Sequence, residues 1–375
     1  MTSITRIVGV IPTPVRILIA LLFALALALA ARSRLAALSA RRLERQREQL
    51  LADVGLLQAA LLPVPPVRLG PVDTSAAYRP ASGPGAGGDF YDVFALEDGQ
   101  LGVIVGDISG HGRQALPHTA LVRFTLRAYL EAGLPPRAAV QTAAVVLERQ
   151  LGESFATVVA ATYNPRKRIL VYACAGHPPP IVLGSKSIAP ITICSSAPIG
   201  AGTRTGTRQT VVSIPGRAQV CFYTDGLTEA RVGPELFGTA RLTHALNELG
   251  SGASAATLLD RVTEETDTRS DDMAACLLHI DGGGAAPTIL AEQLELDRDG
   301  AARDRTGRFL LACGLGRLEI PEIMRSARLA AENDGTVLLE LLLCEGTPQV
   351  MLRRDNVSSL QAHSAARLAG LGVSQ

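Results

Sequence analysis

The apolar positions of this 375-residue chain follow three different patterns along the sequence. Residues 17–31 form an uninterrupted apolar run, whereas residues 35–62 carry apolar side chains on one helical face. From residue 67 onward, short apolar runs alternate with helical periodicity and with turn residues. The sequence therefore predicts an apolar N-terminal helix, an amphipathic helix and a larger part that mixes helices and strands.

The apolar run at residues 17–31 predicts a single-pass membrane anchor within residues 1–34. The run is shorter than the ~20 residues that a bilayer needs, but the mostly apolar residues 7–15 extend it. Because the arginines cluster after the run, the positive-inside rule predicts a cytoplasmic catalytic domain. A cleaved signal peptide is the main alternative, since its apolar region needs only about 7–15 residues. A buried helix of a globular domain is a further one.

Residues 35–66 predict a linker helix that ends at the first of three prolines, Pro63. Its apolar face carries Leu43, Leu50, Val54, Leu57 and Leu61. This face packs either on the chain's own globular domain or on a second copy, which would give a homodimer through residues 43–61. The polar Gln46 and Asp53 exclude a long stable zipper.

Residues 67–281 predict one α+β domain with paired sheets and helices on the outside. The apolar run at residues 101–107 is typical of a strand that is buried on both faces. Helices are expected at 112–132 and 136–152, and hairpin turns at Asn164-Pro165 and Pro215-Gly216. Further short strands are expected at residues 156–163, 169–173, 180–183, 210–214, 218–223 and 273–280.

The glycines at 282–284 suggest a hinge, after which residues 285–375 predict a small α+β unit of unknown role. Its helices are expected near 303–313 and 321–333, its strands at 336–344 and 349–352, and a final helix follows.

Composition excludes several classes of protein. The net charge is +1 and charged residues make up 19%, which argues against nucleic-acid binding and against general disorder. None of the six cysteines forms a CxxC pair, and most lie in apolar runs. We therefore interpret the cysteines as buried apolar residues in a reducing compartment, and not as metal ligands.

Four carboxylates lie next to predicted strands or turns and carry the candidate chemistry: Asp89, Asp107, Asp225 and Asp271. Asp89 follows two glycines, and Asp107 and Asp225 come at the ends of apolar strands. A site made only of oxygen ligands suits hard cations such as Mg²⁺ or Mn²⁺. Two such ions can activate a water for attack on phosphorus, so these residues predict a metal-dependent phosphatase.

The order and wording of the motifs resemble the PPM-type metal-dependent serine/threonine phosphatases. The similarity is to the bacterial sporulation and stress-response branch, which acts in partner-switching regulation of sigma factors, and it covers residues 61–280. The matching segments, in family order, are LLP at 61–63, GGDFYDVF at 87–94, GDISGHG at 106–112, FATVV at 155–159, YACAGHPPP at 172–180, PIG at 198–200, YTDGLTEAR at 223–231, FG at 237–238 and SDDMA at 270–274.

This resemblance implies an αββα sandwich and two Mn²⁺ or Mg²⁺ ions. It implies Asp89, Asp107, Asp225 and Asp271 as metal ligands, with Asp107 bridging, assisted by the carbonyl of Ile108. Asp272 is the less favoured residue of the Asp271-Asp272 pair.

Two histidines remain open. His111 is either a general acid for the leaving oxygen or a turn residue near the site. His177 has either a direct role or a structural hydrogen bond.

The resemblance also implies a substrate class, namely phosphoserine or phosphothreonine on a regulatory protein, specifically an anti-sigma factor antagonist. The alternative is a non-catalytic membrane-tethered scaffold that binds a signalling partner. Hydrolysis of a small phosphorylated metabolite is a third possibility.

Overall fold

The computed structural model describes the two compact units of the chain, Met1–Leu56 and Leu57–Gln375, to different extents. In the first unit it describes residues 14–15, 17–18, 21–35, 39, 41–42 and 44–45. In the second unit it describes residues 62–80, 87–110, 115–184, 196–214, 216–267, 271–282, 290–297, 304–343 and 348–354.

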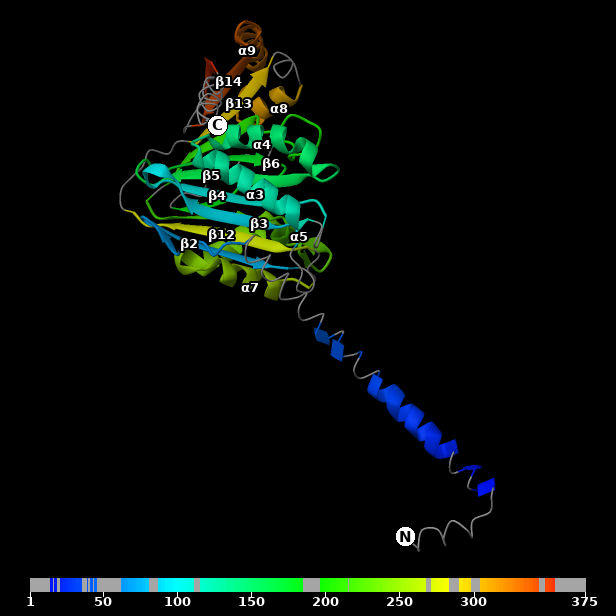
Figure 1. Ribbon diagram of the computed structural model, residues 1–375. Coiled ribbons are helices and arrows are strands. Elements are labelled where there is room, and N and C mark those ends of the chain that lie inside the picture. Colours follow the sequence, from blue (N-terminus) through cyan, green and yellow to red (C-terminus); the bar gives the residue numbers. More distant parts are fainter. Residues whose placement is uncertain are drawn as a thin grey trace, which may run out of the picture. The chain divides into compact units, whose positions relative to one another are not determined.

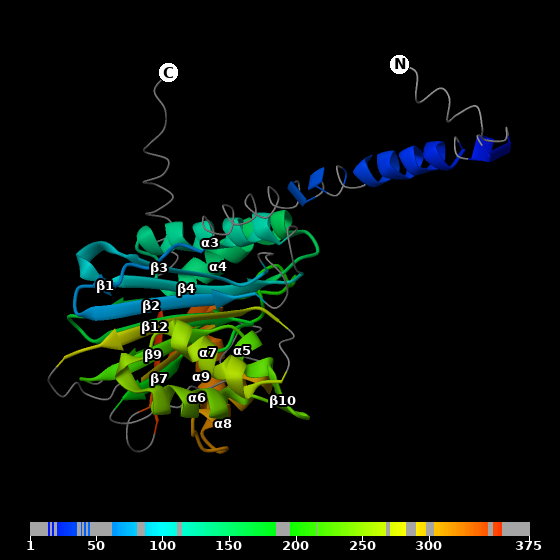
Figure 2. The ribbon, with the colours of Figure 1, turned by 90° about the horizontal axis from the view of Figure 1, so that it is seen from below.

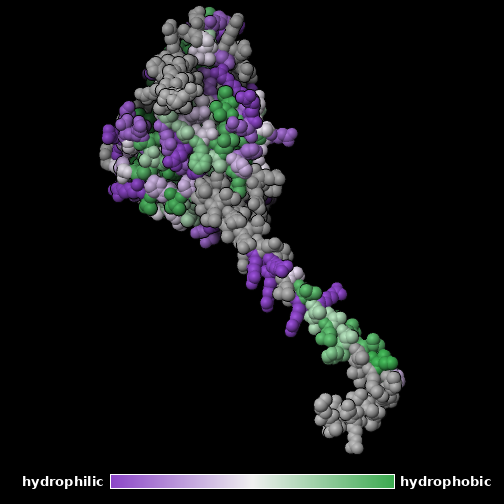
Figure 3. Space-filling model, in the orientation of Figure 1, coloured by the Kyte–Doolittle hydropathy of each residue, from purple (hydrophilic) through white to green (hydrophobic). Residues whose placement is uncertain are grey.

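The expected membrane anchor is wrong for the part of the chain that the structure describes. Residues 21–35 are helical, with exposed apolar side chains that give way to hydrophilic ones, as Figure 3 shows. These 15 residues span about 22 Å, less than the ~30 Å of a bilayer core. None of the described helices is long and apolar enough to cross a membrane. Apart from Glu44 and Arg45, the predicted dimer segment 43–61 lies outside the described residues and stays a prediction.

The second unit contains two antiparallel sheets that face each other, as Figures 1 and 2 show. The first sheet has the order β1 (Arg68–Leu69), β2 (Val72–Arg79), β12 (Met273–Ile280), β9 (Ala218–Tyr223) and β7 (Ile181–Gly184). The second has the order β15 (Gln349–Arg354), β14 (Thr336–Leu342), β13 (Leu290–Asp297), β8 (Arg208–Ser213), β6 (Ile169–Ala175), β5 (Ala156–Asn164), β4 (Leu101–Ile108) and β3 (Phe90–Ala95).

Apolar side chains fill the space between the sheets because each strand alternates its side chains between two faces. Val103 and Val105 of β4 meet Phe222 of β9 and Cys276 of β12 in this central cluster. The other face of β4 is also apolar, with Ile104 and Ile108 beneath helices. This double burial explains why residues 101–107 are continuously apolar and confirms the prediction of a buried strand.

Helices cover both outer faces and complete the expected αββα sandwich (Figure 2). Helices α3 (Leu116–Glu131) and α4 (Pro136–Leu151) pack on the second sheet. Helices α6 (Gly238–Leu249) and α7 (Ala255–Glu265) pack on the first. Shorter elements are η1 (Glu97–Gly99), α5 (Gly226–Glu229), β10 (Arg231–Val232), β11 (Glu235–Leu236) and η4 (Gly250–Gly252).

The C-terminal segment continues the second sheet. Strand β13 pairs with β8, with Glu292 opposite Thr210, and β14 and β15 follow. Helices α8 (Asp304–Ala312) and α9 (Ile320–Asp334) cover these strands with a separate apolar cluster. The division into domains 67–281 and 285–375 stays a prediction, and the predicted final helix lies outside the described residues.

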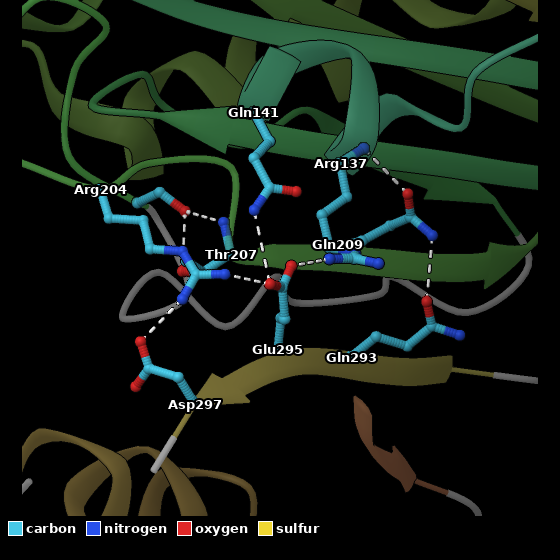
Figure 4. Close-up of polar contacts among 9 residues, drawn as sticks. Arg137, Gln141, Arg204, Thr207, Gln209, Gln293, Glu295 and Asp297 are labelled. Atoms are coloured by element: carbon cyan, nitrogen blue, oxygen red, sulfur yellow. Dashed lines mark hydrogen bonds and ion pairs between the residues drawn. The ribbon is translucent and has the colours of Figure 1, made fainter. Parts of the chain in front are cut away.

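A polar network connects β13 to α4 and to the chain before β8 (Figure 4). The buried carboxylate of Glu295 accepts hydrogen bonds from Arg137 of α4 and from Arg204. Arg204 also donates to Asp297 at 2.7 Å. The Glu295 and Arg137 side chains are 4% and 3% exposed, so losing either partner of this buried ion pair is costly.

We expect Glu295→Ala to lower the free energy of unfolding by about 3–5 kcal/mol, because it removes the carboxylate that compensates the buried Arg137 guanidinium. Chemical unfolding followed by circular dichroism measures this. The control is Glu235→Ala, which removes an exposed ion pair with Arg241 and should cost about 0–1 kcal/mol. Equal losses in the two variants would contradict the assignment of Glu295 as a buried anchor.

Candidate active site

The four predicted carboxylates come from four segments that end at one edge of the sandwich. Asp89 directly precedes β3, and Asp107 is the penultimate residue of β4. Asp225 lies between β9 and α5, and Asp271 lies two residues before β12. Thus Asp89 and Asp107 belong to the second sheet, whereas Asp225 and Asp271 belong to the first. Because the two sheets pack face to face, the four carboxylates lie in one region.

Gly88 allows the two chain segments of the second sheet to come close together. A Cβ atom at residue 88 would overlap the carboxylate of Asp107 and the carbonyl oxygen of Ile108. The Ile108 amide donates to the Gly88 carbonyl at 3.2 Å, which fixes this approach. The Asp107 carboxylate and the Ile108 carbonyl therefore lie side by side, as the predicted ligand pair requires.

Thr224 links the two sheets at the carboxylates. Its hydroxyl donates to Asp89 Oδ2 at 2.6 Å and accepts from the amide of Ala274 at 2.9 Å. Thr224 is fully buried and Asp89 is 5% exposed, so this hydrogen bond orients a carboxylate that solvent barely reaches. The sequence motif YTDG contained this residue, but only the tertiary structure shows its contact with Asp89.

The charges of the carboxylates act on one another. Burial, and next the charges of Asp225, Asp271 and Asp272, raise the pKa of Asp107 to about 7. Burial and the neighbouring Asp107 raise the pKa of Asp89 well above its usual range. Burial, Glu229 and Asp271 raise the pKa of Asp225. This concentration of negative charge favours a positively charged ligand.

Asp272 and Tyr78 are site neighbours that sequence reasoning did not select. The Tyr78 hydroxyl donates to Asp272 Oδ2 at 3.0 Å and accepts from the Gly87 amide at 2.8 Å. Asp272 is buried, with 8% of its surface exposed, whereas Asp271 is exposed. The Asp271 carboxylate accepts a hydrogen bond from the Asp272 amide at 2.8 Å. Tyr78 therefore joins β2 to the glycine pair before Asp89 and to the start of β12. No local sequence signal marks this tyrosine.

His177 has the structural contacts that were one of its two predicted roles. Its Nε2 lies 3.1 Å from the Tyr223 carbonyl, which can only accept, so Nε2 carries the proton. Its Nδ1 then accepts from the Thr157 hydroxyl at 3.0 Å. Thr157 pairs with Asp107, so the ring connects β5 to the end of β9 beside the site. Burial lowers the pKa of His177 to about 3 and keeps the ring neutral.

The donor set fits hard divalent cations in its chemistry, because it consists of carboxylates and one backbone carbonyl. Among the residues that the structure describes, however, no three His, Cys, Asp or Glu side chains come close enough together to hold a metal ion by themselves. Without a bound cation, the negative charges of the site carboxylates repel one another. The ligand set therefore stays a proposal. His111 lies outside the described residues, and its role also stays a prediction.

Comparison with known families identifies relatives of this chain. Residues 97–281 match the family model described as stage II sporulation protein E (SpoIIE). Over 241 residues the chain is 26% identical to protein IcfG of Synechocystis sp. (strain ATCC 27184 / PCC 6803 / Kazusa). That alignment covers 56% of this chain and 37% of IcfG, so the chain spans about a third of that relative.

One of the similar solved structures shares the fold. The SiaA-PP2C domain of Pseudomonas aeruginosa superimposes with a TM-score of 0.53 at 19% identity, over 64% of this chain and 98% of that one. The RsbU and RsbW domains of Rv1364c from Mycobacterium tuberculosis give a TM-score of 0.48 at 23% identity. They cover 72% of this chain and 83% of that one.

We expect Tyr78→Phe to lower the free energy of unfolding by about 1–3 kcal/mol, because it removes the acceptor of the Gly87 amide and the donor to Asp272. Thermal unfolding followed by circular dichroism measures the loss. Tyr129→Phe, on α3 and away from the carboxylates, is the matched control and should change stability little. If both variants lose the same stability, the Tyr78 hydroxyl is not the link described above.

The buried His177 ring should make the free energy of unfolding depend on pH. Its pKa is about 3 in the folded chain and ~6.5 when unfolded, so the unfolded state binds more protons between these values. This contribution makes stability fall as pH decreases below about 6.5. The stability of the wild type relative to His177→Gln should therefore fall by about 2 kcal/mol between pH 7 and pH 5.

Urea unfolding of the wild type and of His177→Gln at each pH gives this difference. Comparing the two chains cancels the opposite contribution of the buried carboxylates, whose raised pKa values destabilise the fold as pH rises. His244→Gln, at a histidine whose side chain is 75% exposed, is the control for the removal of a histidine outside the site. A constant difference for His177→Gln would contradict a buried neutral ring.

Proposed function

We propose a dinuclear metal mechanism and a protein substrate for this chain, which is a PPM-type phosphoprotein phosphatase and belongs to the SpoIIE family through residues 97–281. In the proposed reaction, phosphoserine or phosphothreonine of a regulatory protein is hydrolysed with the help of two Mn²⁺ or Mg²⁺ ions. Asp89, Asp107, Asp225 and Asp271 would hold these ions, together with the Ile108 carbonyl.

One observation carries the proposal of a metal site. The Asp107 carboxylate and the Ile108 carbonyl lie together against Gly88, in the space that a Cβ atom would take. A side chain at residue 88 would separate these two oxygens from the Asp89 segment. This arrangement supports Asp107 as the shared ligand of two ions, because Asp107 also responds to the charges of Asp225 and Asp271.

The chain's own residues supply orientation and proton transfer. Thr224 fixes one oxygen of Asp89, and Tyr78 fixes the glycine pair before it. When bound, the two ions would activate a water and offset the charge of the phosphoryl oxygens. We propose His111, which follows β4 in the sequence, as the general acid that protonates the leaving oxygen of the substrate. No cysteine nucleophile is needed, in agreement with the burial of Cys174, Cys221, Cys276 and Cys313.

The proposed substrate is a phosphorylated anti-sigma factor antagonist. The support is the SpoIIE family match and the ordered motifs that resemble the partner-switching branch. Dephosphorylation would free the antagonist to bind an anti-sigma factor, which in turn would release a sigma factor.

We expect the full chain to hydrolyse p-nitrophenyl phosphate with Mn²⁺ or Mg²⁺ and to lose this activity in EDTA. Asp107→Asn should lower turnover more than about 100-fold, since the loss of an outer-shell partner of a metal ligand alone costs about 10–100-fold. Asp98→Asn, in η1, is the matched control and should keep the wild-type rate.

Calorimetric titration with Mn²⁺ provides a readout that does not depend on turnover. Asp107→Asn should bind the metal more weakly than the wild type and than Asp98→Asn. A folded wild-type chain that neither binds Mn²⁺ nor turns over would contradict the dinuclear mechanism and favour a scaffold. Phosphoserine and phosphotyrosine peptides then test the substrate class, with the serine peptide expected to react.

A further inference from the structure

A cavity of about 540 Å³ lies at the opposite end of the first sheet from the carboxylates. Ala218 and Gln219, which begin β9, and His279 and Ile280, which end β12, line it. The carboxylates lie at the other ends of the same two strands. Six or seven residues of extended chain separate the two places, or about 20 Å.

A row of polar side chains crosses the floor of this cavity. In the register of the sheet, Asp73 of β2 lies opposite His279 of β12, and His279 lies opposite Gln219 of β9. Figure 2 shows the three strands side by side. Gln219 and His279 share their face with Cys221 and Leu277, which belong to the apolar cluster under α6 and α7. The polar row therefore interrupts the apolar face of β9 and β12 at the cavity, and Ser75 of β2 adds a further polar side chain to the lining.

Two atoms of this row have unused hydrogen-bonding capacity. His279 Nε2 donates to the Ala253 carbonyl at 2.7 Å, so the neutral ring has its acceptor at Nδ1. Neither His279 Nδ1 nor Gln219 Nε2 has a partner among the residues that the structure describes, although both atoms are buried. Gln219 is 5% exposed. Buried polar atoms without partners destabilise a fold, so their retention indicates a use.

We propose that this cavity binds a small uncharged ligand that presents a hydrogen-bond acceptor and a donor side by side. The acceptor would pair with Gln219 Nε2 and the donor with His279 Nδ1, after small side-chain rotations that open these atoms to the cavity. A carboxamide group and the amino edge of adenine both have this pattern. The volume falls within the ~300–1,000 Å³ that is usual for such sites.

The charges at the rim support an uncharged ligand. Arg217 is exposed on one side, and the acidic side chains of Asp73 and Asp281 also line the cavity. The Asp73 side chain is 50% exposed and its carboxylate can accept from a ligand hydroxyl, as a ribose would offer. Arg68, whose Nε lies 3.6 Å from Asp73 Oδ1, adds a second basic group beside the rim, so a phosphate would meet as much repulsion as attraction.

The cavity connects directly to the carboxylates through β9 and β12. Asp225 follows β9 and Asp272 precedes β12, so a shift of either strand changes the distance between them. We extend the proposal to a coupling, in which a ligand that shifts β9 or β12 would modulate the phosphatase site. This last step rests on the function proposed above, whereas the binding itself does not.

Isothermal titration calorimetry of the full chain with adenosine and with nicotinamide tests the binding. Adenosine binding supports a nucleobase ligand, and binding of nicotinamide alone supports a carboxamide ligand. N6,N6-dimethyladenosine, which lacks the amino donor, should bind at least about tenfold more weakly than adenosine. If neither adenosine nor nicotinamide binds at millimolar concentration, the proposal is overturned.

Gln219→Met separates a ligand site from a structural role of the side chain. The variant keeps the volume but removes the unpartnered amide, so its melting temperature should equal or exceed that of the wild type while ligand binding weakens about tenfold or more. Gln150→Met, at an exposed position of α4, should leave binding unchanged. A lower melting temperature with unchanged binding would show that Gln219 is structural, and it would overturn the assignment.

A change in p-nitrophenyl phosphate turnover on ligand addition, present in the wild type and absent in Gln219→Met, tests the coupling. Binding without such a change overturns the coupling and leaves the binding site intact. An enzyme without turnover would contradict the proposed function, while calorimetry would still decide the binding.

Discussion

The packing of two sheets face to face is the constraint on which the site depends. Carboxylates that lie close together repel one another, and several of them are also partly stripped of water, as the raised pKa values of Asp89 and Asp107 show. The apolar side chains between the sheets supply the opposing free energy. Because the core packs on both β4 and β9, moving the carboxylates at their ends apart costs packing free energy.

A small number of polar contacts then connects the layers where the apolar core ends. Thr224 and Tyr78 join the two sheets beside the carboxylates, and His177 joins β5 to the end of β9. On the far side of the second sheet, Glu295 joins β13 to α4. Thr224, His177 and Glu295 are buried, where an unpaired polar group is costly. The network thereby ties the C-terminal strands to the fold that carries the site.

Much of the architecture could be predicted from local sequence. The continuous apolar run of β4, the helical periodicity of α3 and α4, and the apolar β9 and β12 all had clear patterns. The sequence analysis missed strands β2, β3 and β13, because polar residues such as Asp92 and Glu292 interrupt their apolar patterns. These strands are stabilised by the neighbouring strands with which they pair. Pro215-Gly216 was expected to close a hairpin, but β8 and β9 belong to different sheets. Turn residues indicate that the chain reverses, but they do not specify which strand the next strand pairs with.

The sequence by itself determined the types of element, the α+β class, the motifs of the phosphatase family and the candidate carboxylates, since these depend on residue type and short spacing. Only the tertiary structure decided that Asp89 meets Thr224 and that Asp272 meets Tyr78, because these pairs lie 135 and 194 residues apart in the chain. It likewise decided that the neutral His177 ring connects the two sheets. Contacts between distant residues depend on how the sheets stack, and the periodicity of single strands carries no information about stacking.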